Sequence, residues 1–380
     1  MKFRVSSFEF RVMTILFMLL IGNIHVKSLE KDSTRYSLLA TYNHGVTLFE
    51  SNQMFYLLND FAKGAEFGVI RRRYQSDVWE KDFKCLETGM SLWFSTFGRK
   101  DILGEGIVLK TFANFQMFQL GKLNARYHLS FGPTYVTKIF DIKHNFHNDS
   151  FSTRLNAYSG IGFMLNYSAT ERIMLTCNYL LHHISNGSFK KPNIGITLMN
   201  FGIGAKYEFN SKPLQPPVYH GKTPLKSREL LCTFGLGANQ ASIYNSQRYI
   251  SGSLSVAHLW YVNKTKAYGM GVDIIHLGGA PFASMEINDE EINKHNTFSD
   301  NLFLGLFATM ESHLGSTSPY LTIGYDVYHK TATIQPMYAR LGFRQKIAGN
   351  LSAHFSIKVR FFFSEFMEFG VAYRLRYKTD

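Results

Sequence analysis

Apolar and polar residues alternate one by one over long stretches of this chain. Residues 201–209, 353–361 and 367–377 show the pattern most clearly, because large apolar side chains occupy every second position and mostly Gly, polar or charged residues stand between them. Successive side chains of a β-strand point to opposite faces, so this period of two predicts strands with one apolar and one polar face.

Sixteen segments carry this pattern or a close variant, and we expect about 12 to 16 of them to form strands. The segments are 36–44, 65–73, 86–95, 103–117, 124–137, 156–167, 171–185, 195–209, 227–238, 249–263, 266–275, 302–310, 318–330, 336–346, 350–361 and 365–377.

Two architectures fit such strands. In a soluble β-sandwich one face packs a core and the other meets water. In a transmembrane barrel the apolar face meets lipid and the polar face lines the interior. The segments are about 9–13 residues long, which suits tilted membrane-spanning strands better than ordinary ones. We therefore predict an all-β fold, an antiparallel transmembrane outer-membrane β-barrel of about 12 to 16 strands.

One connection is unusual for a barrel. Residues 210–227 contain four of the nine prolines and are long for a periplasmic turn. This segment could instead mark a boundary between two barrels or two half-barrels, although no clean internal repeat supports two. We interpret residues 29–380 as one barrel, with the boundary as the alternative.

The first 28 residues predict a secretory signal peptide. Lys2, Arg4 and Arg11 precede the apolar run 12–22, and residues 26–28 supply branched or small residues for a cleavage site. The run is too short to span a bilayer, and no later run of about 18 apolar residues follows. Residues 29–380 would then be the exported protein.

Composition narrows the functional classes. Of 380 residues only 18% are charged and 15% are aromatic, which excludes a disordered chain despite a net charge of +13. The three Cys residues are widely spaced, so they predict neither a disulfide framework nor a zinc site. The basic residues are dispersed in an exported chain, so we expect no nucleic-acid partner, and no metal or cofactor is implied.

Candidate chemistry lies at the end of the segment 171–185. The odd positions there are the more apolar set, so His183 and Ser185 are predicted on the lipid side near the membrane surface. Residues two apart on a strand lie about 6.6 Å apart on one face, within reach of an imidazole–hydroxyl hydrogen bond. His can activate a Ser nucleophile, and backbone N–H groups near Gly187 or the Asn193 amide could stabilise the oxyanion.

The spacing alone proves little, because a His-x-Ser triplet is expected about once by chance in a chain of this length. The alternative is an interfacial His and Ser with no catalytic part. Lys190 and Lys191 follow in the next loop, where they could contact anionic phosphates of a substrate or belong to an ordinary solvated loop.

Residues 182–196 read HHISNGSFKKPNIGI, which resembles the signature of the lipid A 3-O-deacylase (PagL-like) family, also called acyloxyacyl hydrolases. The likeness is strongest over about 155–209, and the C-terminal half is similar in layout to longer Bacteroides-type forms. The resemblance implies a bacterial outer-membrane serine esterase that removes an ester-linked acyl chain from lipid A. Its partners would be lipid A or lipopolysaccharide and other outer-membrane lipids, and its oligomeric state stays open.

Carried onto this sequence, the resemblance makes Ser185 the nucleophile and His183 the base, with Asn193 at the oxyanion. The family has a Glu fourteen residues after the His, where this chain has Thr197. Thr197 should share the face of His183, whereas Glu208 should lie on the opposite face. Either Thr197 orients His183 weakly, another acid acts, or catalysis is impaired.

Two other functions stay open. The missing Glu, together with Lys358, Arg360, Arg374 and Arg376 on the predicted lumen face, fits a channel or structural barrel with a degenerate esterase motif. An esterase for phospholipids or other lipids is the third reading.

Overall fold

The computed structural model describes residues 34–48, 58–73, 77–209, 227–243, 246–282, 297–331, 334–361 and 363–377. The predicted signal peptide and residues 210–226 lie outside these ranges. Among the described residues no helix is long and apolar enough to cross a membrane.

The first eight strands close into one antiparallel barrel, in which β8 pairs with β1 through neighbours such as Ala40 and Ala205. A short helix, α3 (Val78–Asp82), lies between β2 and β3. The strands are β1 (Thr34–Leu48), β2 (Ala62–Arg73), β3 (Cys85–Thr96), β4 (Glu105–Leu120), β5 (Leu123–Val136), β6 (Leu155–Ser168), β7 (Ile173–Ser185) and β8 (Ile196–Glu208).

The other eight strands close into a second antiparallel barrel, in which β16 pairs with β9. Two short 3-10 helices, η1 (Ala280–Phe282) and η2 (Phe298–Asn301), lie between β11 and β12. The strands are β9 (Arg228–Gln240), β10 (Arg248–Asn263), β11 (Lys266–His276), β12 (Leu302–Ser312), β13 (Thr317–His329), β14 (Met337–Ala348), β15 (Leu351–Arg360) and β16 (Phe363–Tyr377).

The predicted β-barrel fold is confirmed, and each of the sixteen predicted segments overlaps an observed strand. The strands form two barrels of eight, where the sequence was interpreted as one barrel over 29–380. Alternation reveals the face of each side chain, but closure depends on which distant strands pair, and alternation carries no signal for that. The break between barrels falls at the proline-containing connection.

Both barrels are apolar outside and polar inside. Outward side chains such as Phe67, Ile203 and Met270 are 57%, 57% and 62% exposed, and similar residues ring both barrels. A soluble protein rarely leaves an apolar surface of this extent in water, whereas lipid accommodates it. The pattern is that of a membrane-embedded barrel.

Both interiors contain paired charges beside buried apolar clusters. In the first barrel Glu87 contacts Arg126 and Lys206, with Lys206 Nζ 3.0 Å from Glu87 Oε2. In the second barrel Arg340 lies 3.1 Å from Asp273 and 2.9 Å from Glu368.

Of the four charges suggested for a channel, Lys358, Arg360 and Arg374 lie inside the second barrel, whereas the Arg376 side chain is 73% exposed and does not lie in the interior as predicted, although it bonds to Glu229. Lys358 and Arg360 contact Glu365, and Arg374 pairs with Glu229 at 3.1 Å. A cavity beside Arg340 measures about 10 Å³, room for about one water molecule. Eight-stranded barrels are just wide enough for side chains to fill them, so these charges plug the barrel and do not line a pore.

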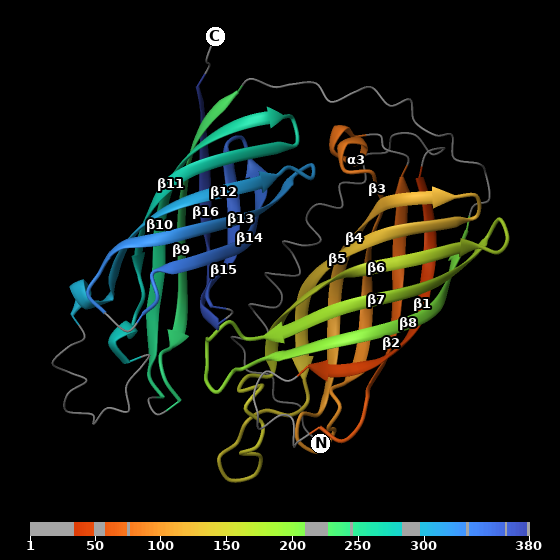
Figure 1. The fold of residues 1–380 in the computed structure, drawn as a ribbon, viewed down its shortest axis with the longest axis horizontal. Helices are drawn as coiled ribbons and strands as arrows, with labels where there is room; N and C mark the ends of the chain where they lie inside the picture. Colours follow the sequence, from red (N-terminus) through yellow and green to blue (C-terminus); the bar gives the residue numbers. More distant parts are fainter. Residues whose placement is uncertain are drawn as a thin grey trace.

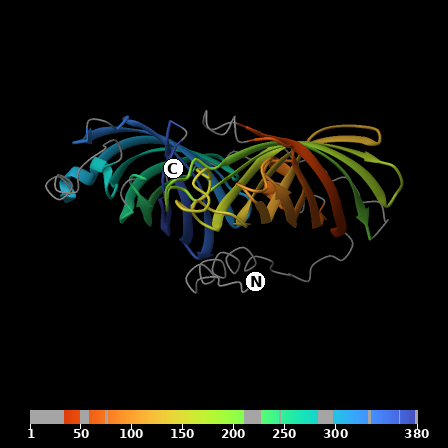
Figure 2. The ribbon, with the colours of Figure 1, turned by 90° about the horizontal axis from the view of Figure 1, so that it is seen from below.

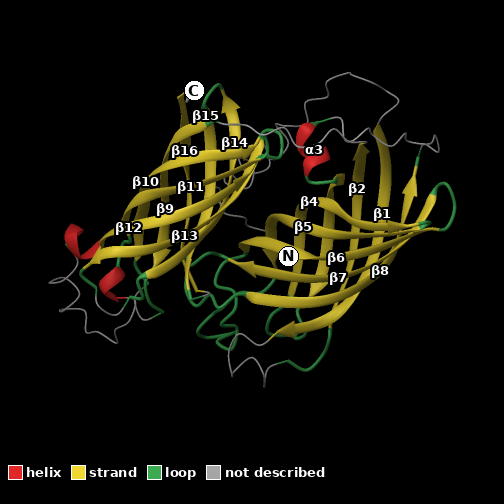
Figure 3. Cartoon of the chain, turned by 45° about the horizontal axis from the view of Figure 1, so that its top comes forward, coloured by secondary structure: helices red, strands yellow, loops and turns green. Residues whose placement is uncertain are grey.

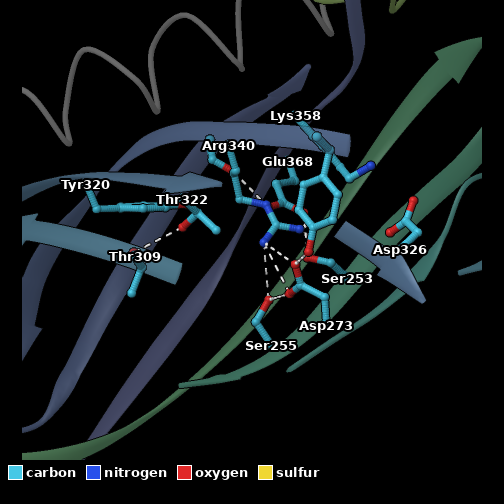
Figure 4. Close-up of polar contacts among 12 residues, drawn as sticks. Ser253, Ser255, Asp273, Thr309, Tyr320, Thr322, Asp326, Arg340, Lys358 and Glu368 are labelled. Carbon is cyan, nitrogen blue, oxygen red and sulfur yellow. Dashed lines mark hydrogen bonds and ion pairs between the residues drawn. The ribbon is translucent and has the colours of Figure 1, made fainter. Parts of the chain in front are cut away.

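The two barrels lie side by side, and their strands run in a similar direction (Figure 1). Figure 2 shows the molecule from the end at which residues 137–154 connect β5 to β6 and residues 186–195 connect β7 to β8. The short turns lie at the opposite end, near α3 (Figure 3). Figure 4 shows Arg340 between Asp273, Ser255 and Glu368 inside the second barrel.

Candidate active site

The candidate site lies where β7 ends and β8 begins. His183 is the register partner of Thr197, and Ile184 is the partner of Ile196. Ile184 and Ile196 are fully buried in a hydrophobic cluster that also contains Leu198, inside the first barrel. Because neighbouring residues on a strand face opposite ways, this anchoring places His183, Ser185 and Thr197 together on the outer face.

Thr197 holds the imidazole of His183. The distance from His183 Nδ1 to Thr197 Oγ1 is 2.9 Å. When Nδ1 carries the proton, it donates to this hydroxyl, and Nε2 keeps the lone pair that a general base requires. A hydroxyl fixes the ring and its tautomer but brings no negative charge to stabilise the imidazolium. Glu208 lies inside the barrel, as predicted, with its carboxylate 2.8 Å from both Arg35 and Arg72.

The side chains of His183 and Ser185 both pack against Gly195. A Cβ at Gly195 would lie 3.0 Å from His183 Cε1 and 3.1 Å from Ser185 Cβ. Gly195 also has φ +84°, in the left-handed region that favours glycine. Gly195 was not among the predicted site residues, although a Gly beside a strand can mark a close approach of the backbone.

Asn193 is bonded to the residue that follows Ser185. Its Oδ1 accepts a 3.0 Å hydrogen bond from the backbone N–H of Asn186, the residue after Ser185. Its Nδ2 is buried and has no hydrogen-bond partner among the described residues. A buried N–H without a partner is costly, so such a group is a candidate ligand-binding donor.

The connection between β7 and β8 is held on one side by the β5–β6 loop. The N–H of Gly195 donates to the Ser150 carbonyl at 3.2 Å. Ser152 Oγ donates to the Lys190 carbonyl at 2.6 Å and accepts from Asn186 Nδ2 at 3.1 Å. Asn186 and Ser152 were missed as site residues, because the sequence alone does not bring these loops together.

Of the remaining candidates, Gly187 and Lys191 contact the second barrel, whereas the Lys190 carbonyl is bonded to Ser152 of the first barrel. Gly187 has φ +62° and packs against Met367. Lys191 Nζ donates to the Ala241 carbonyl at 3.0 Å, and burial lowers the pKa of this ammonium group. The side chain of Lys190 is half-buried. Across the ranges that the structure describes, no three His, Cys, Asp or Glu side chains form a group that could hold a metal ion.

Solved structures give only weak likeness. A triple mutant of the Rhodopseudomonas blastica porin is 11% identical, covers 90% of this chain and 99% of its own, and has a TM-score of 0.18. A structure titled "Asymmetric conductivity of engineered proteins" is 9% identical, with the same coverage and a TM-score of 0.19. Similarity at this level has no bearing on function. No curated protein matches the chain.

Family models match both barrels. The model described as lipid A 3-O-deacylase (PagL) matches residues 69–206, which contain the whole candidate site. The model described as acyloxyacyl hydrolase, C-terminal domain, matches residues 228–377, the span from the start of β9 to the end of β16. The resemblance found in the sequence is thereby confirmed over most of the chain, and the chain belongs to the PagL family of lipid A 3-O-deacylases and acyloxyacyl hydrolases.

Proposed function

We propose that this protein is an outer-membrane serine esterase that hydrolyses an ester-linked acyl chain of lipid A. The observation that carries the proposal is that His183 and Ser185 share one face of β7 and both lie next to Gly195, with Nδ1 of His183 close to the Thr197 hydroxyl. A hydrolytic site on this face, in which Ser185 itself is 6% exposed, suits a substrate whose acyl chains lie in the membrane. The exported, outer-membrane location follows from the predicted signal peptide and the apolar exterior.

The chemistry uses groups of this chain alone. His183 Nε2 takes the proton of Ser185 Oγ as the oxygen attacks the ester carbonyl. Asn193 Nδ2, with the Gly187 N–H as the second proposed donor, stabilises the oxyanion. The protonated imidazole then gives its proton to the leaving alcohol. Water, activated by the same imidazole, releases the fatty acid and restores Ser185.

The two lysines have different proposed parts. Lys190 contacts a phosphate of lipid A, because it lies in the loop beside the nucleophile and its charge suits an anion. Lys191 acts through the shape of the loop, since its ammonium group is already bonded to the Ala241 carbonyl. Of the three options for Thr197, we favour orientation of His183 through its hydroxyl.

The test compares lipid A by mass spectrometry from cells that express the wild type or Ser185→Ala. We expect loss of one acyl chain with the wild type alone, and the mass lost identifies that chain. Thr88→Ala removes an outward hydroxyl on β3 and serves as the matched control, with full activity expected. Unchanged lipid A from cells in which the wild-type barrel is folded and inserted would refute the proposal.

A further inference from the structure

The second barrel contacts the loop that carries the candidate site. Ser188 Oγ lies 3.0 Å from Ser364 Oγ at the start of β16 and also donates to the Ser364 carbonyl. The N–H of Gln240, the last residue of β9, donates to the Ser188 carbonyl at 2.9 Å. Two strands of the second barrel therefore hold one residue of the first barrel's loop.

Further contacts extend this docking along the loop. The N–H of Lys191 donates to Gln240 Oε1 at 2.9 Å. A Cβ on Gly187 would lie 2.2 Å from Met367 Cγ, so the backbone there lies directly on β16. The guanidinium of Arg248 stacks 4.5 Å from the centre of the Phe189 ring.

These contacts fall between the two groups that the mechanism needs. The docked residues 187–191 begin two residues after Ser185 and end two residues before Asn193. The β5–β6 loop fixes the other side of the same segment through Ser150 and Ser152. A nucleophile and an oxyanion donor must be held to within about 1 Å, so a loop held from one side only is a poor support for them.

The opposite end of the barrels provides an equivalent contact far from the site. Thr265 Oγ1 donates to Asp82 Oδ2 at 2.7 Å, which joins the β10–β11 turn to α3. Phe131 and Phe343 pack between the barrels, with ring centres 5.0 Å apart. Thr265 is thus an inter-barrel contact that can be removed without touching the catalytic loop.

We propose that the second barrel is a positioning element for the esterase site, and that Gln240 and Ser364 are its positioning residues. This inference rests on the proposed esterase function. Gln240 holds the loop by its backbone N–H and its side-chain oxygen, on both sides of Lys190. The second barrel therefore contributes to turnover without contacting the ester.

The first experiment measures fatty-acid release from lipid A in mixed micelles by the full-length protein. Gln240→Ala should lower kcat about 10-fold or more with little change in KM, because the misplaced loop affects the transition state more than binding. Gln240→Glu keeps an oxygen that accepts from Lys191 and should recover most of kcat. Thr265→Val should retain the wild-type kcat.

The outcomes separate the two proposals. Equal kcat for Gln240→Ala and Thr265→Val, with Ser185-dependent release by the wild type, would overturn the positioning role alone. Absence of Ser185-dependent release by the wild type would overturn both.

A covalent link supplies a second measurement. The S188C/S364C variant should form a disulfide under oxidising conditions, detected by peptide mass spectrometry, because the two hydroxyl oxygens lie 3.0 Å apart. When Gln240→Ala is added to S188C/S364C, the disulfide should restore most of the kcat that Gln240→Ala alone loses. Reduction of the disulfide should remove this gain. Failure of the disulfide to form in folded protein would contradict the docking.

Discussion

At the scale of single residues, Thr197 decides how well His183 is supported. Thr197→Glu places a carboxylate where the Thr hydroxyl now lies 2.9 Å from Nδ1. The charge stabilises the imidazolium, so we expect kcat to rise about 10-fold or more and the acidic limb of its pH profile to move to higher pH. Thr197→Val removes the hydrogen bond and should lower kcat. A pH–kcat series on the three proteins tests this, and an unchanged profile for Thr197→Glu would argue that another group supports His183.

Asn193 permits a similarly sharp test of the oxyanion donor. Asn193→Asp keeps the Oδ1 that accepts from the Asn186 N–H but replaces the Nδ2 donor by an oxygen. We expect kcat to fall about 10²–10³-fold while KM changes little, because the lost bond forms chiefly in the transition state. Single-turnover measurements check this fall in kcat. Asn193→Ala also removes the bond to the Asn186 N–H, so any further fall in kcat measures the contribution of that bond. A fall confined to KM would assign Asn193 to substrate binding.

At the scale of elements, Gly195 places the end of the β7–β8 loop against the proposed catalytic residues His183 and Ser185. In Gly195→Ala the new Cβ would lie 2.9 Å from the Ile184 carbonyl and 3.0 Å from His183 Cε1, in a strained left-handed conformation. We expect activity to fall more than about 10-fold in a barrel that still inserts. Gly121→Ala is the control, because Gly121 also has positive φ but has nothing within 4 Å of its Cβ position. Equal activity of the two variants would show that the close approach of Gly195 to His183 and Ser185 is not needed for activity.

The sequence predicts the strands well because alternation is a local property. The same alternation placed His183, Ser185 and Thr197 on one face and Glu208 on the other, as the structure has them. The positioning role proposed for Gln240 had no such signal. It depends on contacts between segments distant in the chain, which a single sequence does not encode in its periodicity.

At the scale of the whole molecule, buried charge pairs share the interiors of the closed barrels with apolar clusters. Arg340 is the centre of one such network, with Asp273 at 3.1 Å and Glu368 at 2.9 Å. Arg340→Met leaves two buried carboxylates without this partner, and we expect a loss of about 3–5 kcal/mol in the free energy of unfolding. Lys63→Ala breaks an exposed pair with Asp60 and should cost less than about 1 kcal/mol.

Urea unfolding in lipid vesicles measures the loss in the free energy of unfolding for Arg340→Met and Lys63→Ala. Fatty-acid release measured on the same samples tests whether catalysis depends on the stability of the second barrel. If that barrel positions the loop, Arg340→Met should lose fatty-acid release at lower urea concentration than the wild type. The loss should accompany the unfolding of residues 228–377, even though Arg340 is remote from the ester. Release that persists after the second barrel has unfolded would mean that the first barrel alone maintains the site. Coincident loss would mean that the two closed barrels act as one catalytic unit.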